Sequence, residues 1–277
     1  MPENITKILQ IKDIILCCDE YLFLYNIKSL KDNPVKYPLK LNDILKLNDG
    51  KLLGITNKNL IIIDIESIIA ELATNKIKNH HKIVFKFPDD WYIKPTLKKT
   101  MEKIYMHLLS NNKLLLHFFL IEKEGTCKIT RYKWNKIYIL DLNNYRLIHS
   151  FEKIRYEIKI IVLSNYICIK DSKTINIYNI NDYKLVNDLE LEFYNSSIDK
   201  YKDNILIELF TYDGDIVIIL YDLSNVKKMK KCILRIKHIK CHVFRMHILN
   251  NLKIFATGYD IPNYYAYILK VDNLNFN

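Results

Sequence analysis

The chain has 277 residues, of which 49% are apolar and 26% charged, so it can build a buried core and is not a disordered chain. Five glycines and six prolines also exclude collagen-like and linker-like low complexity. The formal net charge of +11 points to a polyanionic partner, but only five of the 42 basic residues are arginines. Arginine grips phosphates and bases with two parallel hydrogen bonds, whereas lysine gives diffuse attraction or solubility. Because Lys, Asn, Ile and Tyr share AT-rich codons, we interpret part of this charge as codon bias.

The N-terminal segment predicts neither a secretory signal nor a membrane anchor. It reads MPENITKILQIKDIIL and lacks a charged region followed by a long apolar stretch. No apolar run in the chain approaches the roughly 18 residues of a transmembrane helix. The six cysteines include no CxxC pair, which excludes zinc ribbons and thioredoxin-like motifs and favours reduced thiols in a core. We therefore expect a cytoplasmic, intracellular protein without a transmembrane segment.

An internal repeat organises the chain. In each copy a short apolar segment ends in Asp or Asn and is followed by one more apolar residue. Five copies carry this pattern and a sixth, weaker copy has lysine at the Asp or Asn position; they cover residues 22–27, 60–65, 137–142, 175–180, 218–223 and 266–271. The copies recur about every 40 residues, with one interval near twice that length, and such a period is typical of repeat folds.

Further strand signals surround each copy of the repeat. A second apolar segment precedes most copies, as at residues 13–18, 51–56, 166–170, 204–212 and 252–257, and strand-favouring Ile, Tyr, Val and Phe dominate these segments. Asp213-Gly214 lies between two apolar runs and predicts a hairpin turn between the second and third strands of the fifth unit. Each unit therefore reads as four short strands, and the even spacing favours a propeller over a sandwich or a barrel.

Three copies of the repeat end in a way that points to a known family. The segments ending Tyr25-Asn26, Tyr178-Asn179 and Tyr221-Asp222 resemble the Trp-Asp end of WD repeats, with Tyr in place of Trp, although the Gly-His pair that opens a typical WD repeat is missing. The resemblance covers most of the chain and implies an all-β, WD-like β-propeller. We expect six four-stranded antiparallel blades in a single domain over residues 1–277. The region around 73–102, inside the double-length interval, is interpreted as an insertion or as a degenerate seventh blade.

No enzyme signature is present. The GxGxxG, GxxxxGK(S/T), HExxH and GxSxG motifs are absent, so we expect no catalytic residue, no cofactor and no metal. One group carries zinc-ligand residue types without a known spacing, and we interpret it as surface histidines and core cysteines; it comprises Cys232, His238, Cys241, His242 and His247. His80-His81 and Asp89-Asp90 are interpreted as surface loop pairs. A propeller enzyme with a site in the central channel stays open, because residues from different blades would build such a site.

One stretch of charge stands out. Residues 227–245 contain no acid and eight basic residues, namely Lys227, Lys228, Lys230, Lys231, Arg235, Lys237, Lys240 and Arg245. Arg235 and Lys237 alternate with apolar residues, which predicts an outer strand with one wet face. The stretch is either a contact patch for an acidic protein, RNA or anionic lipid, or lysine protection of an edge strand. Base-stacking aromatics other than Phe244 are missing, as is the Arg-Arg pair of the Phe-Arg-Arg-Gly motif in phosphoinositide-binding propellers.

Together these features favour a non-catalytic protein-interaction scaffold of the WD-repeat-like propeller type, whose protein partner the sequence does not identify. The repeat and the missing catalytic motifs carry this interpretation. The alternative is a polyanion-binding module that uses residues 227–245 to bind RNA or anionic lipid. Such binding would weaken steeply with salt.

Overall fold

The computed structural model describes residues 7–19, 21–29, 34–71, 80–91, 100–124, 129–154, 158–171, 173–192, 196–213, 215–236, 242–249, 253–260 and 263–270. It divides the chain into two compact units, Met1–Arg155 and Tyr156–Asn277. Over the described residues the one α-helix is α1 (Ile65–Glu71), and nearly all other regular structure is β-strand. The all-β prediction is confirmed. No described helix is long and apolar enough to span a membrane.

The first unit contains three four-stranded antiparallel sheets whose strands follow one another in chain order. The first sheet consists of β1 (Lys7–Ile11), β2 (Ile14–Asp19), β3 (Tyr21–Asn26) and β4 (Val35–Lys40). The second consists of β5 (Asp43–Lys46), β6 (Leu52–Ile55), β7 (Asn59–Ile63) and β8 (His81–Lys86). The third consists of β9 (Thr100–Leu109), β10 (Lys113–Glu124), β11 (Ile129–Asp141) and β12 (Arg146–Ile154). The 3₁₀ turns η1 (Ile27–Ser29) and η3 (Asp89–Trp91) follow β3 and β8.

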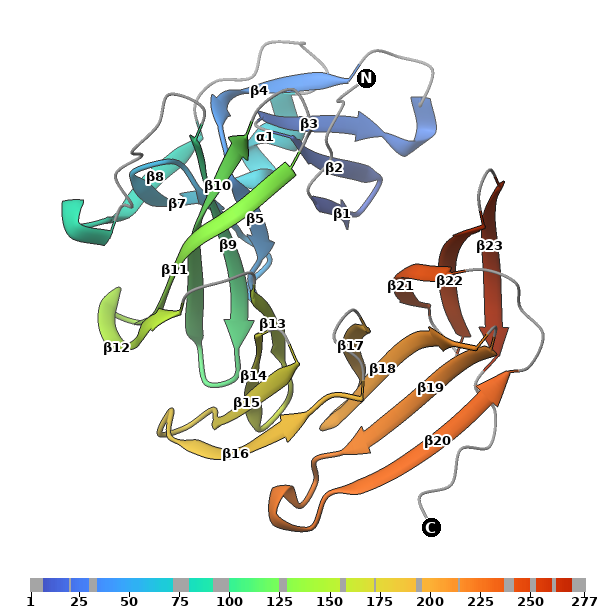
Figure 1. Ribbon diagram of the computed structural model, residues 1–277. Helices are drawn as coiled ribbons and strands as arrows, with labels where there is room; N and C mark the ends of the chain where they lie inside the picture. The colour runs from blue at the N-terminus through green and yellow to red at the C-terminus, as the bar shows by residue number, and fades with distance from the viewer. Residues whose placement is uncertain are drawn as a thin grey trace. The chain divides into compact units, whose positions relative to one another are not determined.

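The second unit contains two more sheets of the same kind and one sheet of three described strands. They are formed by β13 (Ile158–Val162), β14 (Tyr166–Asp171), β15 (Thr174–Asn179) and β16 (Leu185–Glu190); by β17 (Ser197–Lys202), β18 (Ile205–Tyr212), β19 (Asp215–Asp222) and β20 (Lys230–Ile236); and by β21 (His242–Leu249), β22 (Lys253–Asp260) and β23 (Asn263–Lys270). The strands β17–β20 lie side by side in chain order, with β20 outermost (Figure 1). The predicted four-stranded unit is confirmed for five copies of the repeat.

The Asp or Asn that ends each repeat copy closes the turn after the third strand of its sheet. Its side-chain oxygen accepts a hydrogen bond of 2.8–3.0 Å from the backbone N–H two residues further on; this occurs at Asn26, Asp141, Asn179 and Asp222. Asp64 instead caps α1, where its carboxylate accepts from the backbone N–H and the hydroxyl of Ser67. The repeat is therefore a turn signal, because short Asx side chains replace a backbone acceptor in such turns.

The apolar residue after this Asp or Asn ties the turn to the rest of its sheet. The N–H groups of Leu142, Ile180 and Leu223 donate to carbonyl oxygens in the turn between the first and second strands of the same sheet, at 2.8–3.0 Å. Their side chains are buried. Each repeat copy therefore joins the two turns at one end of its sheet.

The double-length interval contains the outer strand of the second sheet and an aromatic anchor. After β8 the chain turns back at η3, where Trp91 is 4% exposed and stacks on Tyr138 of β11 with ring centroids 3.9 Å apart. Phe118 of β10 meets the Trp91 ring edge-on. Residues 72–79 and 92–99 lie outside the described part of the chain, so the insertion around 73–102 stays a prediction.

Apolar clusters bind consecutive sheets within each unit. In the first unit one cluster joins the first two sheets and another, which includes Phe118, joins the second and third. In the second unit a cluster that includes Ile177, Leu206 and Ile219 joins the sheet β13–β16 to the sheet β17–β20. Cys17, Cys18 and Cys168 are buried and form no disulfide, in agreement with the predicted core thiols, and Cys127 and Cys241 lie outside the described residues.

Candidate interaction surface

The basic stretch 227–245 begins on a 3₁₀ turn and an outer strand. Lys227 and Lys228 lie in η4 (Val226–Lys228), whose N-cap Asn225 accepts a hydrogen bond from the Lys227 N–H. Lys230, Lys231 and Arg235 lie in β20, the outer strand of its sheet, as the alternation predicts. Along its inner edge β20 pairs with β19 over its whole length, and no described strand pairs with its outer edge.

The two faces of β20 differ in chemistry. One face carries Lys231, Ile233 and Arg235, which pair with buried Tyr221, Ile219 and Val217 of β19. Ile233 is 54% exposed although it lies between two cations. The other face begins with exposed Lys230 and continues with Cys232, Leu234 and Ile236, which are half-buried. Over residues 231–236, β20 is therefore cationic on one face and apolar on the other.

The start of β20 is fixed to the neighbouring sheet of the same unit. The Lys231 ammonium forms an ion pair with Glu192 and lies 5.7 Å from the centre of the Tyr221 ring. The Asn187 amide of β16 donates to the Val226 carbonyl at 2.9 Å, which holds η4. Lys231 is therefore the member of the stretch that an acid already neutralises.

Four exposed cations of the stretch have no recorded acidic partner among the described residues. These are Lys227, Lys228, Lys230 and Arg235. Lys237 and Lys240 lie outside the described residues. Arg245 lies in β21, opposite Thr257 of β22, so the stretch divides between two sheets. The sequence correctly placed Arg235 on an outer strand, but it did not show that Glu192, 39 residues from Lys231, would bind that lysine.

The five candidate metal ligands lie on two different strands or outside the described residues. Cys232 is in β20, His242 and His247 are in β21, and His238 and Cys241 lie outside the described residues. The part of the chain that the structure describes contains no group of three potential metal ligands. The histidines of the pair His80-His81 have partners instead. His80 Nε2 lies 3.0 Å from a Glu71 oxygen, and His81 Nδ1 lies 3.2 Å from the Tyr37 hydroxyl.

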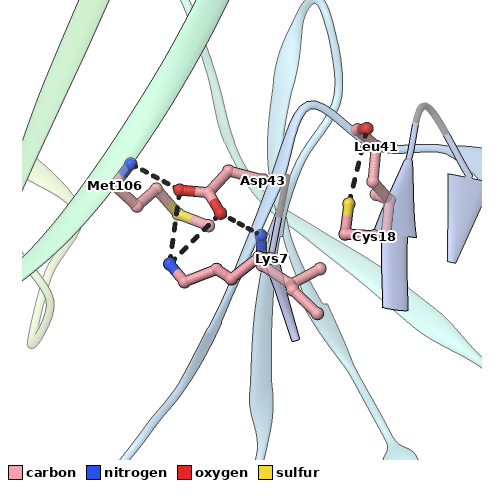
Figure 2. Close-up of polar contacts among 6 residues, drawn as sticks. Lys7, Cys18, Leu41, Asp43 and Met106 are labelled. Carbon is pink, nitrogen blue, oxygen red and sulfur yellow. Dashed lines mark hydrogen bonds and ion pairs between the residues drawn. The ribbon is translucent and has the colours of Figure 1, made fainter. Parts of the chain in front are cut away.

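A buried aspartate, which no sequence pattern predicts, joins the first strands of three sheets in the first unit. Asp43 of β5 lies 3.2 Å from the Lys7 ammonium of β1, and accepts a 2.8 Å hydrogen bond from the Met106 N–H of β9 (Figure 2). Its other oxygen accepts from the Ile44 N–H at 2.8 Å. Burial raises the pKa of Asp43 above its ordinary value, although Lys7 and the two N–H groups oppose that shift. Its partners lie 36 and 63 residues away, too far for a local motif.

Two further buried polar pairs lie within single sheets. His117 of β10 has its Nε2 2.8 Å from Asn135 Oδ1 of β11, and burial lowers the pKa of His117 to about 4. Tyr221 of β19 donates to Glu208 of β18 at 2.5 Å, and burial together with this bond raises the pKa of Tyr221. Glu208 is fully buried and its second oxygen has no hydrogen-bond partner among the described residues. Neither pair brings together a nucleophile, a base and an oxyanion donor.

Comparison with known proteins addresses the fold. No protein-family model matches the chain, and no curated protein matches it. The crystal structure of the Myceliophteria_thermophila Cps50 (Swd1) β-propeller domain is similar over 92% of this chain and 80% of that chain, with 11% sequence identity and a TM-score of 0.54. The fold is that of a divergent WD-like β-propeller.

A second solved structure matches this propeller over nearly its whole length. The complex of the fission yeast SREBP-SCAP binding domains is similar over 97% of this chain and 76% of that chain, with 13% identity and a TM-score of 0.50. At such identities the likeness establishes the propeller fold and nothing about its partner. The resemblance to WD repeats of the segments that end at Asn26, Asn179 and Asp222 therefore agrees with the fold of these structures.

Proposed function

We propose that this propeller is a non-catalytic platform that binds another protein inside the cell. The observation that supports the proposal most directly is the outer strand β20, whose outer edge pairs with no described strand and whose Lys230 and Arg235 have no acidic partner among the described residues. An unpaired strand edge offers backbone groups to another chain, and the cations beside it favour an acidic surface on that chain. The WD-like propeller fold agrees with this function by analogy. We further propose that the six sheets are six blades of one domain, with an insertion around 73–102.

Affinity purification of the full chain at mild salt tests the platform function. We expect at least one protein to be recovered reproducibly and to crosslink to the propeller in a defined stoichiometry. A denatured sample of the same chain serves as the control for non-specific recovery. If no protein distinguishes the folded chain from this control, the platform function is wrong.

The second candidate function is polyanion binding, which the exposed Lys227, Lys228, Lys230 and Arg235 favour. Binding to a single-stranded RNA oligomer or to vesicles of anionic lipid should weaken steeply as salt rises, because released counterions drive it. Changing these four residues to Glu should abolish the binding. Changing Lys231 to Glu should matter less for RNA, since Glu192 already pairs with Lys231. Unchanged binding by the fourfold variant would contradict this candidate.

A further inference from the structure

We propose that β20 binds an extended segment of an acidic partner protein by strand addition along its outer edge. The added strand would present acidic side chains on one face and apolar side chains on the other. This inference rests on the proposed platform function and names the partner's chemistry and its mode of docking. The backbone of an outer strand offers a row of N–H and C=O groups to such a segment.

The side chains of β20 specify which segment fits. In a sheet extended by one strand, the two faces of the new strand continue the two faces of β20. Acidic residues of the partner would lie beside Arg235, the cation of this face that no described acid pairs with, and apolar residues would continue the half-buried row of Cys232, Leu234 and Ile236. Lys227 and Lys228 in η4 add positive charge next to the start of the strand. The complementary segment therefore alternates acidic and apolar residues.

The protection that usually blunts an outer strand covers only the start of β20. Lysine and proline are common devices against unwanted pairing, and the outer strand β4 contains Pro38. In β20 the lysines are the first two residues, and Lys231 is bound to Glu192. The five residues from Cys232 to Ile236 hold the single charge of Arg235 and no proline. This half of the strand is open to pairing, which weakens the interpretation that the basic stretch is edge protection alone.

A pair of synthetic peptides with equal composition tests the mode of binding. One peptide alternates glutamate and valine over about nine residues, a common strand length, and the other carries the same residues in two blocks. Fluorescence anisotropy on the full chain should give at least about tenfold tighter binding for the alternating peptide, because only that order separates the two faces. The amides of residues 230–236 that point away from β19, every second one along the strand, should then gain protection from hydrogen exchange. Equal binding of the two peptides, or no binding of the alternating one, would overturn strand addition.

Two variants with matched exposure test the location. Ile233→Glu on β20 should weaken the alternating peptide at least about tenfold, because it places an acid among the partner's acids. Leu185→Glu on β16 should leave the affinity unchanged, although Leu185 is 55% exposed and Ile233 is 54% exposed. Equal loss in both variants, with both folded by circular dichroism, would contradict docking on β20.

The same variants separate this inference from the platform function. A protein recovered equally by the wild type and by Ile233→Glu would leave the platform function standing and would exclude β20 as its docking strand. RNA binding that Ile233→Glu leaves intact, together with no peptide binding, would favour the polyanion candidate instead. Recovery of no protein at all would count against the platform function itself.

Discussion

The two units of the propeller each carry a lysine–aspartate pair that joins the first strands of two consecutive sheets, but the pairs differ in burial. In the first unit Lys7 of β1 pairs with Asp43 of β5 at 3.2 Å, and in the second Lys159 of β13 pairs with Asp199 of β17 at 3.0 Å. Both aspartates accept a 2.8 Å hydrogen bond from the next backbone N–H. The Asp43 side chain is 5% exposed, whereas that of Asp199 is 40% exposed. The same local chemistry therefore lies in two different dielectric environments.

This difference shows why the contribution of an ion pair to stability cannot be inferred from its N–O distance alone. An exposed pair gains little because water screens it and the side chains lose entropy. Burial of an aspartate costs free energy. Its removal from the folded protein is nevertheless destabilising, because its partners then lose their acceptor. Asp43 has an additional partner that Asp199 lacks among the recorded contacts, the Met106 N–H of a third sheet. We therefore expect Asp43 to stabilise the first unit far more than Asp199 stabilises the second.

The largest effect should come from Asp43→Ala. We expect the free energy of unfolding to fall by about 3–5 kcal/mol, because the change strands the Lys7 ammonium and the buried Met106 N–H. The matched Asp199→Ala variant should lose less than about 1 kcal/mol. Urea denaturation followed by circular dichroism measures both. Losses of equal size would show that burial does not distinguish the two pairs.

The next largest effect on the free energy of unfolding should come from His117, which is buried and neutral. It forms a hydrogen bond with Asn135 rather than an ion pair. Its pKa is about 4 in the folded chain and 6.5 in the reference state, so the unfolded chain binds an extra proton between these values. The stabilisation is present above pH 6.5 and is lost as the pH falls toward 4; it amounts to at most about 3 kcal/mol. His107, whose pKa burial also lowers to about 4, adds a loss in the same window.

His117→Gln removes one of these two titrations while it keeps a polar partner for Asn135. We expect the free energy of unfolding of this variant to depend less steeply on pH between 6.5 and 4 than that of the wild type. The midpoints of urea denaturation at several pH values measure the slope. A slope equal to that of the wild type would mean that His117 is protonated in the folded chain.

Glu208 offers a contrast to Asp43, because it is a buried carboxyl group without a cationic partner among the described residues. Its one recorded partner is the Tyr221 hydroxyl, and its second oxygen has none among the described residues. Replacement of both partners by apolar residues, Glu208→Leu with Tyr221→Phe, should leave the free energy of unfolding unchanged or raise it by about 1–2 kcal/mol. Glu208→Leu alone should lower it by about 1 kcal/mol, since it leaves the Tyr221 hydroxyl unpaired. If the double variant lost as much free energy of unfolding as Asp43→Ala, Glu208 would have a role other than its hydrogen bond to Tyr221.

Strands, turns and the repeat could be predicted from the sequence, because they depend on neighbouring residues. The contacts that could not be predicted join residues that are far apart in the chain. The Asp or Asn at the end of each copy acts on a backbone N–H only two residues away, so its role is written in adjacent residues. Asp213-Gly214 predicts the turn between β18 and β19 for the same reason. No neighbouring residue signals the role of Asp43, because its partners Lys7 and Met106 belong to two other sheets and lie 36 and 63 residues away.

The same holds for β20: its local pattern could be predicted from the sequence, and its contacts with distant residues could not. Alternation within residues 230–236 predicts an outer strand, and β20 is one. The exposure of Ile233 and the pairing of Lys231 with Glu192 depend on the neighbouring sheet, so the pattern of β20 alone does not contain them. The region of the predicted insertion around 73–102 is a similar case. Trp91 packs into the core of the first unit against Tyr138 and Phe118, although Asp89 and Asp90 precede it in the sequence.

A small effect, comparable with the loss of one exposed contact, should come from the repeat residues themselves. Asn179 lies at the surface end of β15, and its side-chain oxygen accepts one hydrogen bond from the Asn181 N–H at 2.8 Å. Asn179→Ala should lower the free energy of unfolding by about 1 kcal/mol, the usual net worth of one hydrogen bond. Asn179→Asp keeps the acceptor and should cost almost nothing, which thermal melting of the two variants would compare. If Asn179→Ala proved as costly as Asp43→Ala, each copy of the repeat would hold its sheet together through the turn rather than through the core. Because four sheets share this turn while one aspartate joins three sheets, we expect the opposite order.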